Sequence, residues 1–184
     1  MSQTSYQPGP AAGAEVHPQG DHWQLVLVRD LRHAPEKVWR ALTDPAELRE
    51  WAPFDADRSL AAAGPVTLST VGAPSPQVDE TRVTRAEAPK LLEYRWGGNE
   101  MRWELAPHAG GTRLKLWHSI DRRFVAWGAA GWHVCFDVLD RWLGGEPIGR
   151  LVGGDALKSP GWQRLMAEYS KQFGVEAPNW GAAG

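Results

Sequence analysis

Alternate residues in the segments 92–96, 101–105 and 113–118 separate an apolar face from a charged one. Because successive side chains of a β-strand point to opposite faces, these segments predict strands with one face turned to the core. The apolar face combines polar-tipped rings, aliphatic side chains and one histidine: Leu92, Tyr94, Trp96, Met101, Trp103, Leu105, Leu114, Leu116 and His118. Trp117 falls on the other face. Rings of this kind on a sheet covered by a helix can line a ligand pocket.

His118 is the titratable group on that face that can exchange a proton near neutral pH. Two interpretations stay open: a core histidine among the chain's eleven tryptophans, or part of a site. Several hydrogen-bonding rings on one face exceed what a dry core satisfies easily, which favours a partly hydrated cavity. Catalysis needs a positioned partner as well, and the face offers only Tyr94. His118 is therefore a weak catalytic candidate and a stronger ligand-binding one.

A second polar group recurs at helical spacing in the segment 131–143, where His133, Asp137 and Arg141 are four residues apart. Such residues stack along one face of a helix. A His/Asp pair can orient a general base, but no serine or cysteine nucleophile is placed with it. We expect this pair on or near the surface. The neighbouring face is apolar and predicted to pack on the sheet: Trp132, Cys135, Phe136, Leu139, Trp142 and Leu143.

The sequence contains no pattern that is typical of a metal site or a redox-active site. The six histidines, at positions 17, 22, 33, 108, 118 and 133, lack metal-ligand spacing. The single cysteine, Cys135, lies in an apolar helical stripe and excludes an internal disulfide. We expect a packed thiol, no metal and no cofactor.

The elements around these residues predict an α+β fold. The segment 23–31 is apolar enough for a first strand, and Pro35 suits the first turn of a short helix. Asp44 and Glu47 predict a capping box that starts a second short helix. Strand-like pieces separated by Gly, Pro and Asn turns follow from 54 to 119, ahead of the long helix. An antiparallel meander with a long helix across it is the economical arrangement.

Composition limits the partners. The chain of 184 residues has 20 Lys and Arg against 22 Asp and Glu and no basic stripe, which argues against nucleic acid or an anionic membrane. No apolar run approaches the roughly 20 residues that span a bilayer, and the first residues lack a signal-like segment. We expect a cytoplasmic protein without membrane insertion.

The domain organisation is predicted to be simple. Residues 1–21 are rich in small and polar residues and predict a disordered tail. Residues 22–174 form one domain, and residues 175–184 form a second tail whose Trp180 can dock back on the body.

Several motifs carry a family resemblance that covers roughly residues 23 to 174. They are APEKVWRALTDP at 34–45, LEYRW at 92–96, GTRLKLWHS at 111–119, GWH at 131–133 and the segment 161–173. Together they resemble the family of homologues of the activator of heat-shock-protein-90 ATPase, within the START-like (SRPBCC) superfamily. The resemblance implies the helix-grip fold, in which an antiparallel sheet curves around a long C-terminal helix, with two short helices after the first strand.

That fold implies a deep cavity between the sheet and the C-terminal helix. We expect its ligand to contact one set of residues: Trp39, Trp51, Tyr94, Trp96, Met101, Trp103, Leu116, His118, Trp132, Phe136 and Leu139. The segment 120–130 and an insert at 144–160 depart from the family pattern, so the rim is expected to be this chain's own.

Three functions remain open, because the superfamily includes lipid carriers, hormone receptors, cyclases and chaperone activators. The first is binding of a small apolar or aromatic ligand, lipid-like or polyketide-like. The second is a cyclase, dehydratase or hydrolase that uses His118, or His133 with Asp137, as acid and base. The third is interaction with a chaperone or regulator in the stress response. The sequence favours binding over catalysis.

Overall fold

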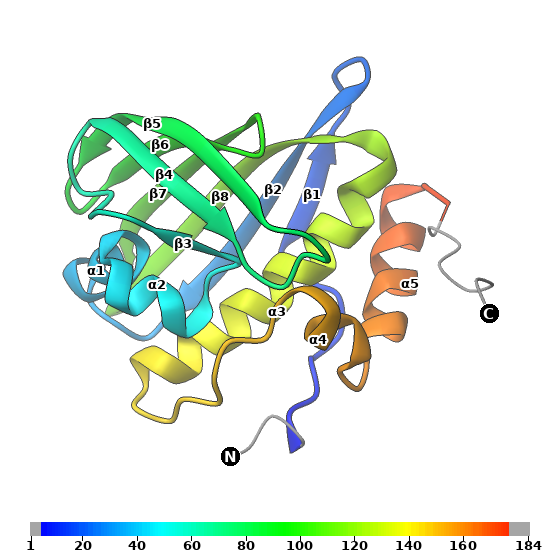
Figure 1. Cartoon of the computed structure of the whole chain (residues 1–184). Helices are drawn as coiled ribbons and strands as arrows, with labels where there is room; N and C mark the ends of the chain where they lie inside the picture. The colour runs from blue at the N-terminus through cyan, green and yellow to red at the C-terminus, as the bar shows by residue number, and fades with distance from the viewer. Residues whose placement is uncertain (1–4, 177–184) are drawn as a thin grey trace.

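The computed structural model describes residues 5–176 and shows one eight-stranded antiparallel sheet that curves around a long helix (Figure 1). The strand order is β1-β2-β8-β7-β6-β5-β4-β3. The strands are β1 (Ala14–His17), β2 (His22–Leu31), β3 (Phe54–Ala56), β4 (Gly64–Thr70), β5 (Gln77–Glu87), β6 (Leu91–Trp96), β7 (Asn99–His108) and β8 (Gly111–Asp121). The helices are α1 (Pro35–Thr43), α2 (Pro45–Trp51), the 3-10 turn η2 (Arg122–Phe124), α3 (Val125–Leu143), α4 (Gly153–Lys158) and α5 (Trp162–Phe173). The predicted helix-grip fold is confirmed.

The register of β6, β7 and β8 explains the face pattern of the sequence. Tyr94 pairs with Met101, and Met101 pairs with His118, so these three side chains form one row across the sheet. All three are buried. Trp117, one residue before His118, stacks on His17 instead, with 6.2 Å between ring centroids. The face assignment made from alternate residues is therefore confirmed.

The two short helices begin at residues that are typical of helix starts. Pro35 occupies the first turn of α1, where its missing N–H is not needed. Asp44 caps α2 and accepts hydrogen bonds from the amides of Ala46 (2.8 Å) and Glu47 (3.4 Å). The second bond of the predicted capping box, from the amide of Asp44 to the Glu47 carboxylate, is not formed. The amide of Asp44 already donates to the carbonyl of Arg40 (2.9 Å), and the Glu47 carboxylate pairs with the Arg40 guanidinium.

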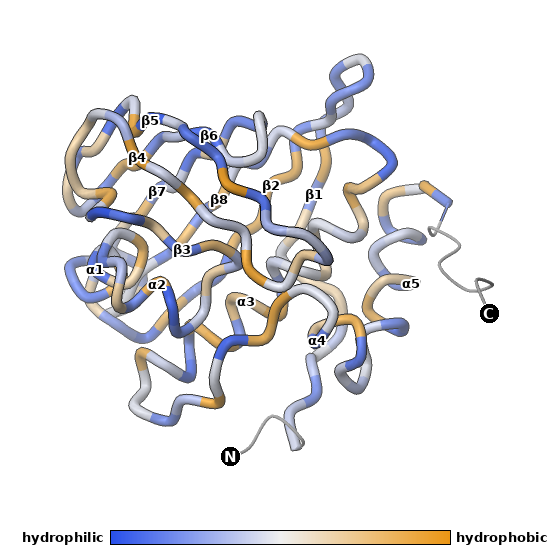
Figure 2. Tube along the Cα trace, viewed as in Figure 1, coloured by the Kyte–Doolittle hydropathy of each residue, from blue (hydrophilic) through white to orange (hydrophobic). Residues whose placement is uncertain are grey.

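α3 lies across the concave face of the sheet, and α5 packs on α3 (Figure 1). α3 begins at Val125, earlier than the segment 131–143 suggested, so its first turns extend the cover over the sheet. In Figure 2 the hydrophobic stretches follow the strands and α3, whereas the turn between β1 and β2 is hydrophilic. Among the described residues, none of the helices combines the length and hydropathy needed to cross a membrane.

The N-terminal segment is part of the fold, so the prediction of a disordered tail is wrong for residues 5–21. β1 pairs with β2 along its whole length, and Tyr6 is only 2% exposed. Side chains of α5 hold the backbone of this segment: Arg164 donates to the carbonyl of Pro8 (2.6 Å) and Gln172 to that of Ala14 (2.6 Å). The composition of the segment does not reveal this order, because the segment has no hydrophobic core of its own and packs against α3 and α5. Residues 1–4 and 177–184, including Trp180, lie outside the described residues.

Candidate functional site

Five rings meet between the sheet and α3, and we call them the ring cluster: Trp96 of β6, Trp103 of β7, His118 of β8, and Trp132 and Phe136 of α3. Trp132 is central. Its centroid lies 5.4 Å from that of Trp103 and 6.0 Å from those of His118 and Trp96, with the rings edge to face. Trp96 stacks on His118 at 6.0 Å with an interplanar angle of 29°. Such edge-to-face and stacked geometries are the favourable ones for aromatic pairs.

The polar tips of the three indoles find partners inside the protein. Trp132 donates to Nδ1 of His118 (3.0 Å), Trp103 to the Tyr94 hydroxyl (2.9 Å), and Trp96 to Oγ1 of Thr70 (3.0 Å). The expectation that these rings require hydration is therefore wrong for the indoles. Within residues 5–176, one polar atom of the ring cluster has no hydrogen-bond partner, Nε2 of His118.

Burial sets the protonation of the ring cluster. It lowers the pKa of His118 to about 4, so the imidazole is neutral at pH 7. It also raises the pKa of Tyr94, whose hydroxyl stays protonated. Because that hydroxyl is bonded to Trp103 rather than to His118, the two residues do not form an acid-base pair. Burial likewise raises the pKa of the Cys135 thiol to about 12, in keeping with a packed thiol.

The other predicted ligand-contacting residues lie in the same hydrophobic core as the ring cluster: Trp39, Trp51, Tyr94, Met101, Leu116 and Leu139. Trp51 of α2 contacts Trp103 edge to face at 6.0 Å and donates to the carbonyl of Ala41 (2.9 Å). Trp96 differs from all of them because it is only half-buried. It is the ring through which the cluster reaches the surface.

His133 and Asp137 are not a surface pair, and that prediction is wrong. His133 is 5% exposed, and its Nδ1 lies 2.7 Å from the Tyr169 hydroxyl of α5. Asp137 accepts from Arg29 of β2 (2.6 Å) and from the Tyr6 hydroxyl. Its distance to Nε2 of His133 is 3.7 Å. α5 and the N-terminal segment cover this face of α3, which the helix sequence alone does not reveal.

The residues that sequence reasoning missed are the partners from outside α3, namely Tyr6, Arg29 and Tyr169. The available signal was a charged Arg29 directly after the apolar run 25–28 of β2. Arg141, expected to stack with Asp137, lies over the Tyr6 ring, with 5.6 Å from the guanidinium carbon to the centroid. Burial lowers the pKa of His133, so this histidine is also neutral at pH 7.

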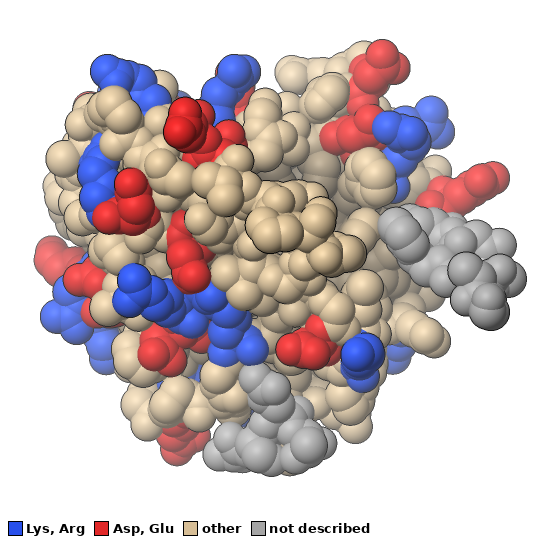
Figure 3. Space-filling view, in the orientation of Figure 1, with Lys and Arg blue, Asp and Glu red and all other residues tan. Residues whose placement is uncertain are grey.

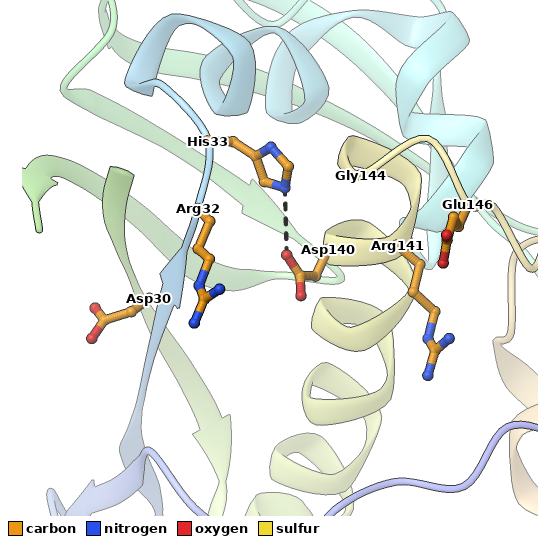
Figure 4. A pocket seen from close by; sticks show the side chains of 7 residues that line it. All are labelled: Asp30, Arg32, His33, Asp140, Arg141, Gly144 and Glu146. Atoms are coloured by element: carbon orange, nitrogen blue, oxygen red, sulfur yellow. Dashed lines mark ion pairs between the residues drawn. The ribbon is translucent and has the colours of Figure 1, made fainter. Parts of the chain in front are cut away.

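A separate surface pocket of 380 Å³ lies where β2 ends beside the last turn of α3 (Figure 4). It is lined by acidic and basic side chains, a histidine and a glycine: Asp30, Arg32, His33, Asp140, Arg141, Gly144 and Glu146. His33 and Asp140 approach to 3.6 Å across it. It shares no residue with the ring cluster, and its chemistry differs from that of an apolar site.

Two glycines join the β4–β5 turn to α4 near the half-buried edge of the ring cluster. A Cβ at Gly153 would lie 2.4 Å from the carbonyl oxygen of Gly72, so the two backbones touch. Gly72 directly follows Val71, and the preceding Thr70 holds Trp96. In Figure 3 the surface over this turn is uncharged, while charges of both signs alternate around it. The insert 144–160 therefore contacts the β4–β5 turn, close in sequence to the residue that bonds Trp96.

Comparison with known proteins places the chain in a family. Residues 22–167 match the family described as "Polyketide cyclase / dehydrase and lipid transport", and the chain belongs to it. The predicted membership of the START-like superfamily is confirmed. No curated protein matches the chain.

Solved structures share the fold at low sequence identity. CalU16 from Micromonospora echinospora is 20% identical, with a TM-score of 0.61 over 88% of this chain and 92% of that one. DynU16, from the dynemicin biosynthetic locus, is 22% identical, with a TM-score of 0.60 over 72% and 50%. An AHSA1-like protein from Aeromonas hydrophila is 20% identical, with a TM-score of 0.55 over 66% and 92%. At these identities the likeness is one of fold.

Proposed function

We propose that this protein binds a small hydrophobic molecule, aromatic or polyketide-like, between the sheet and α3 and does not convert it. The observation that carries the proposal is the ring cluster, with half-buried Trp96 at its edge. Flat apolar ligands are held by ring faces and edges of this kind. The family description, which names polyketides and lipids, and the neighbour from a biosynthetic locus support the same class of ligand.

Binding fits the geometry better than a cyclase or hydrolase mechanism does. A general base must reach the proton that it removes, and Nδ1 of His118 is already occupied by the Trp132 indole. The other His/Asp pair is enclosed, with Asp137 held by Arg29 and Tyr6 and His133 by Tyr169. Neither group is arranged as a free general base. Nε2 of His118 has no partner among the described residues, but Tyr94, the candidate second group for acid-base catalysis, is bonded to Trp103. The chaperone-partner alternative has only the AHSA1-like fold in its support.

Entry of a ligand is expected at Trp96. This indole is the half-buried ring of the cluster, and a single hydrogen bond to Thr70 fixes its polar end. Thr70→Val keeps the side-chain shape and removes the acceptor, so it should speed ligand association several-fold. Thr84→Val is the matched control, because the Thr84 hydroxyl is exposed and donates to the carbonyl of Glu93 (3.2 Å) away from the cluster.

The test is a titration with 2-acetylnaphthalene followed by two-dimensional NMR, together with native mass spectrometry of the purified protein. The proposal expects shifts of the indole N–H signals of Trp96, Trp103 and Trp132. Shifts confined to the charged pocket of Figure 4 would contradict it. His118→Gln should change affinity by no more than about tenfold, or ~1.4 kcal/mol. A bound ester or polyketide analogue that the wild type converts and His118→Gln does not would establish the enzyme instead.

A further inference from the structure

We infer that the ligand is a neutral molecule whose carbonyl oxygen accepts a hydrogen bond from Nε2 of His118, and not a carboxylate such as a fatty acid. This inference rests on the proposed function and narrows the chemical class of its ligand. Aromatic ketones, quinones and esters belong to the class.

The tautomer of His118 follows from one hydrogen bond. An indole nitrogen is a donor only, so the contact of 3.0 Å between Nε1 of Trp132 and Nδ1 of His118 makes Nδ1 the acceptor. A neutral imidazole carries a single proton, which must then sit on Nε2. His118 therefore presents Nε2–H as a donor.

That donor is buried without an acceptor among residues 5–176. His118 is 3% exposed, so bulk water does not satisfy it. Buried polar groups are nearly always hydrogen-bonded, so an unpaired one is expected to bond to a water or a ligand atom. The Tyr94 hydroxyl, which belongs to the same row of the sheet, accepts from Trp103 and does not accept from His118. A ligand oxygen would accept the missing hydrogen bond from Nε2–H of His118.

The surroundings of His118 select a neutral oxygen. Trp96 and Trp132 contact its ring, while Leu25 and Met101 flank it on the adjacent strands. All four are uncharged. The cation beside the cluster is Arg29, whose guanidinium carbon lies 5.9 Å from the Phe136 centroid, and it is paired with Asp137 at 2.6 Å. A carboxylate buried here would lose its hydration without gaining a free cation.

The stack of Trp96 on His118 favours a flat ligand. The two rings are 29° from parallel at 6.0 Å, and Trp96 is the half-buried member. A planar aromatic molecule that displaces the indole can take over its stacking on His118 and Trp132. Aliphatic chains lack that geometry.

Three probes of matched size distinguish a neutral carbonyl ligand from a hydrocarbon and from a carboxylate. They are 2-acetylnaphthalene with a carbonyl, 2-isopropylnaphthalene without one, and 2-naphthoate with a charge. The wild-type protein should bind the ketone roughly tenfold more tightly than the hydrocarbon, as expected for one buried neutral hydrogen bond, and should bind the naphthoate most weakly at about pH 7. Equal affinity for ketone and hydrocarbon, or tightest binding of naphthoate, would overturn the inference and leave the proposed function standing. If all three bind without perturbing the ring cluster, or none binds, the proposed function fails as well.

Two variants and one spectrum complete the test. His118→Phe keeps a ring and removes the donor, so the preference for the ketone should disappear. His118→Gln can accept from Trp132 and still donate, so the preference should persist. Nitrogen-15 spectra of the unliganded wild-type histidine ring should show a proton on Nε2 and none on Nδ1. A proton on Nδ1 would refute the inference whatever the variants do.

Discussion

Tyr6 donates a hydrogen bond to the carboxylate of Asp137, a residue 131 positions further along the chain. Arg29 pairs with the other carboxylate oxygen at 2.6 Å, and Arg141 lies over the Tyr6 ring. One side chain thus fastens the N-terminal segment to the helix that carries Trp132 and Phe136. The segment belongs to the support of the site.

Tyr6→Phe should lower the free energy of unfolding by about 1–2 kcal/mol, because it removes one hydrogen bond to the half-buried carboxylate of Asp137. The loss is moderate because Asp137 still pairs with Arg29. Urea denaturation measures the change. Gln7→Ala, at an exposed neighbouring position, is the control and should have little effect. Equal stability of Tyr6→Phe and wild type would mean that the segment is not docked in solution.

Trp132→Ala should remove the centre of the ring cluster and cost about 3–5 kcal/mol, the usual loss for a buried aromatic side chain truncated to a cavity. The same denaturation curves provide the value. A loss below that of a surface substitution would contradict the packing of α3 on the sheet.

A surface position of His133, as the sequence predicts, would make His133→Ala nearly neutral, and the buried position in the structure reverses that expectation. Truncating a buried ring that bonds Tyr169 should cost about 2–4 kcal/mol. His22→Ala, an exposed histidine, serves as the matched control. Similar stabilities of the two variants would place His133 at the surface after all.

Stability should fall in mild acid. The pKa of His118 is about 4 in the folded protein, below the ordinary 6.5, so the unfolded chain takes up the proton first as the pH drops. The contribution of the neutral ring is complete above about pH 6.5 and is lost towards pH 4, in total ~3 kcal/mol. The lowered pKa of His133 acts in the same direction. Denaturation at about pH 7 and about pH 4.5 should show a smaller loss for His118→Gln than for wild type; an identical loss would exclude His118 as the cause.

Gly153→Ala should destabilise the protein by about 2 kcal/mol or more, because Gly153 has φ of +58° and no room for a Cβ against Gly72. Gly154→Ala is a nearly ideal control, since nothing lies within 4 Å of its Cβ position. It should be neutral or stabilising by up to about 1 kcal/mol. Thermal melts of the pair distinguish the two sites, and matching melts would mean that the β4–β5 turn does not touch α4.

The sequence by itself determined which residues face the core. Strand alternation is a local property with a period of two, so it assigned Tyr94, Trp103 and His118 to one face and Trp117 to the other. Pro35 and the Asp44 cap act on their own first turns, and they marked the short helices correctly. These features depend on chain neighbours alone.

Only the tertiary structure decided the partners of the polar groups. The docking of Tyr6 on Asp137, the burial of His133 under α5 and the bond that sets the tautomer of His118 each join residues from different elements. Periodicity says which face a side chain occupies, but it does not say what covers that face. The N-terminal segment was misjudged for this reason: its order comes from contacts with α3 and α5 and not from its own composition.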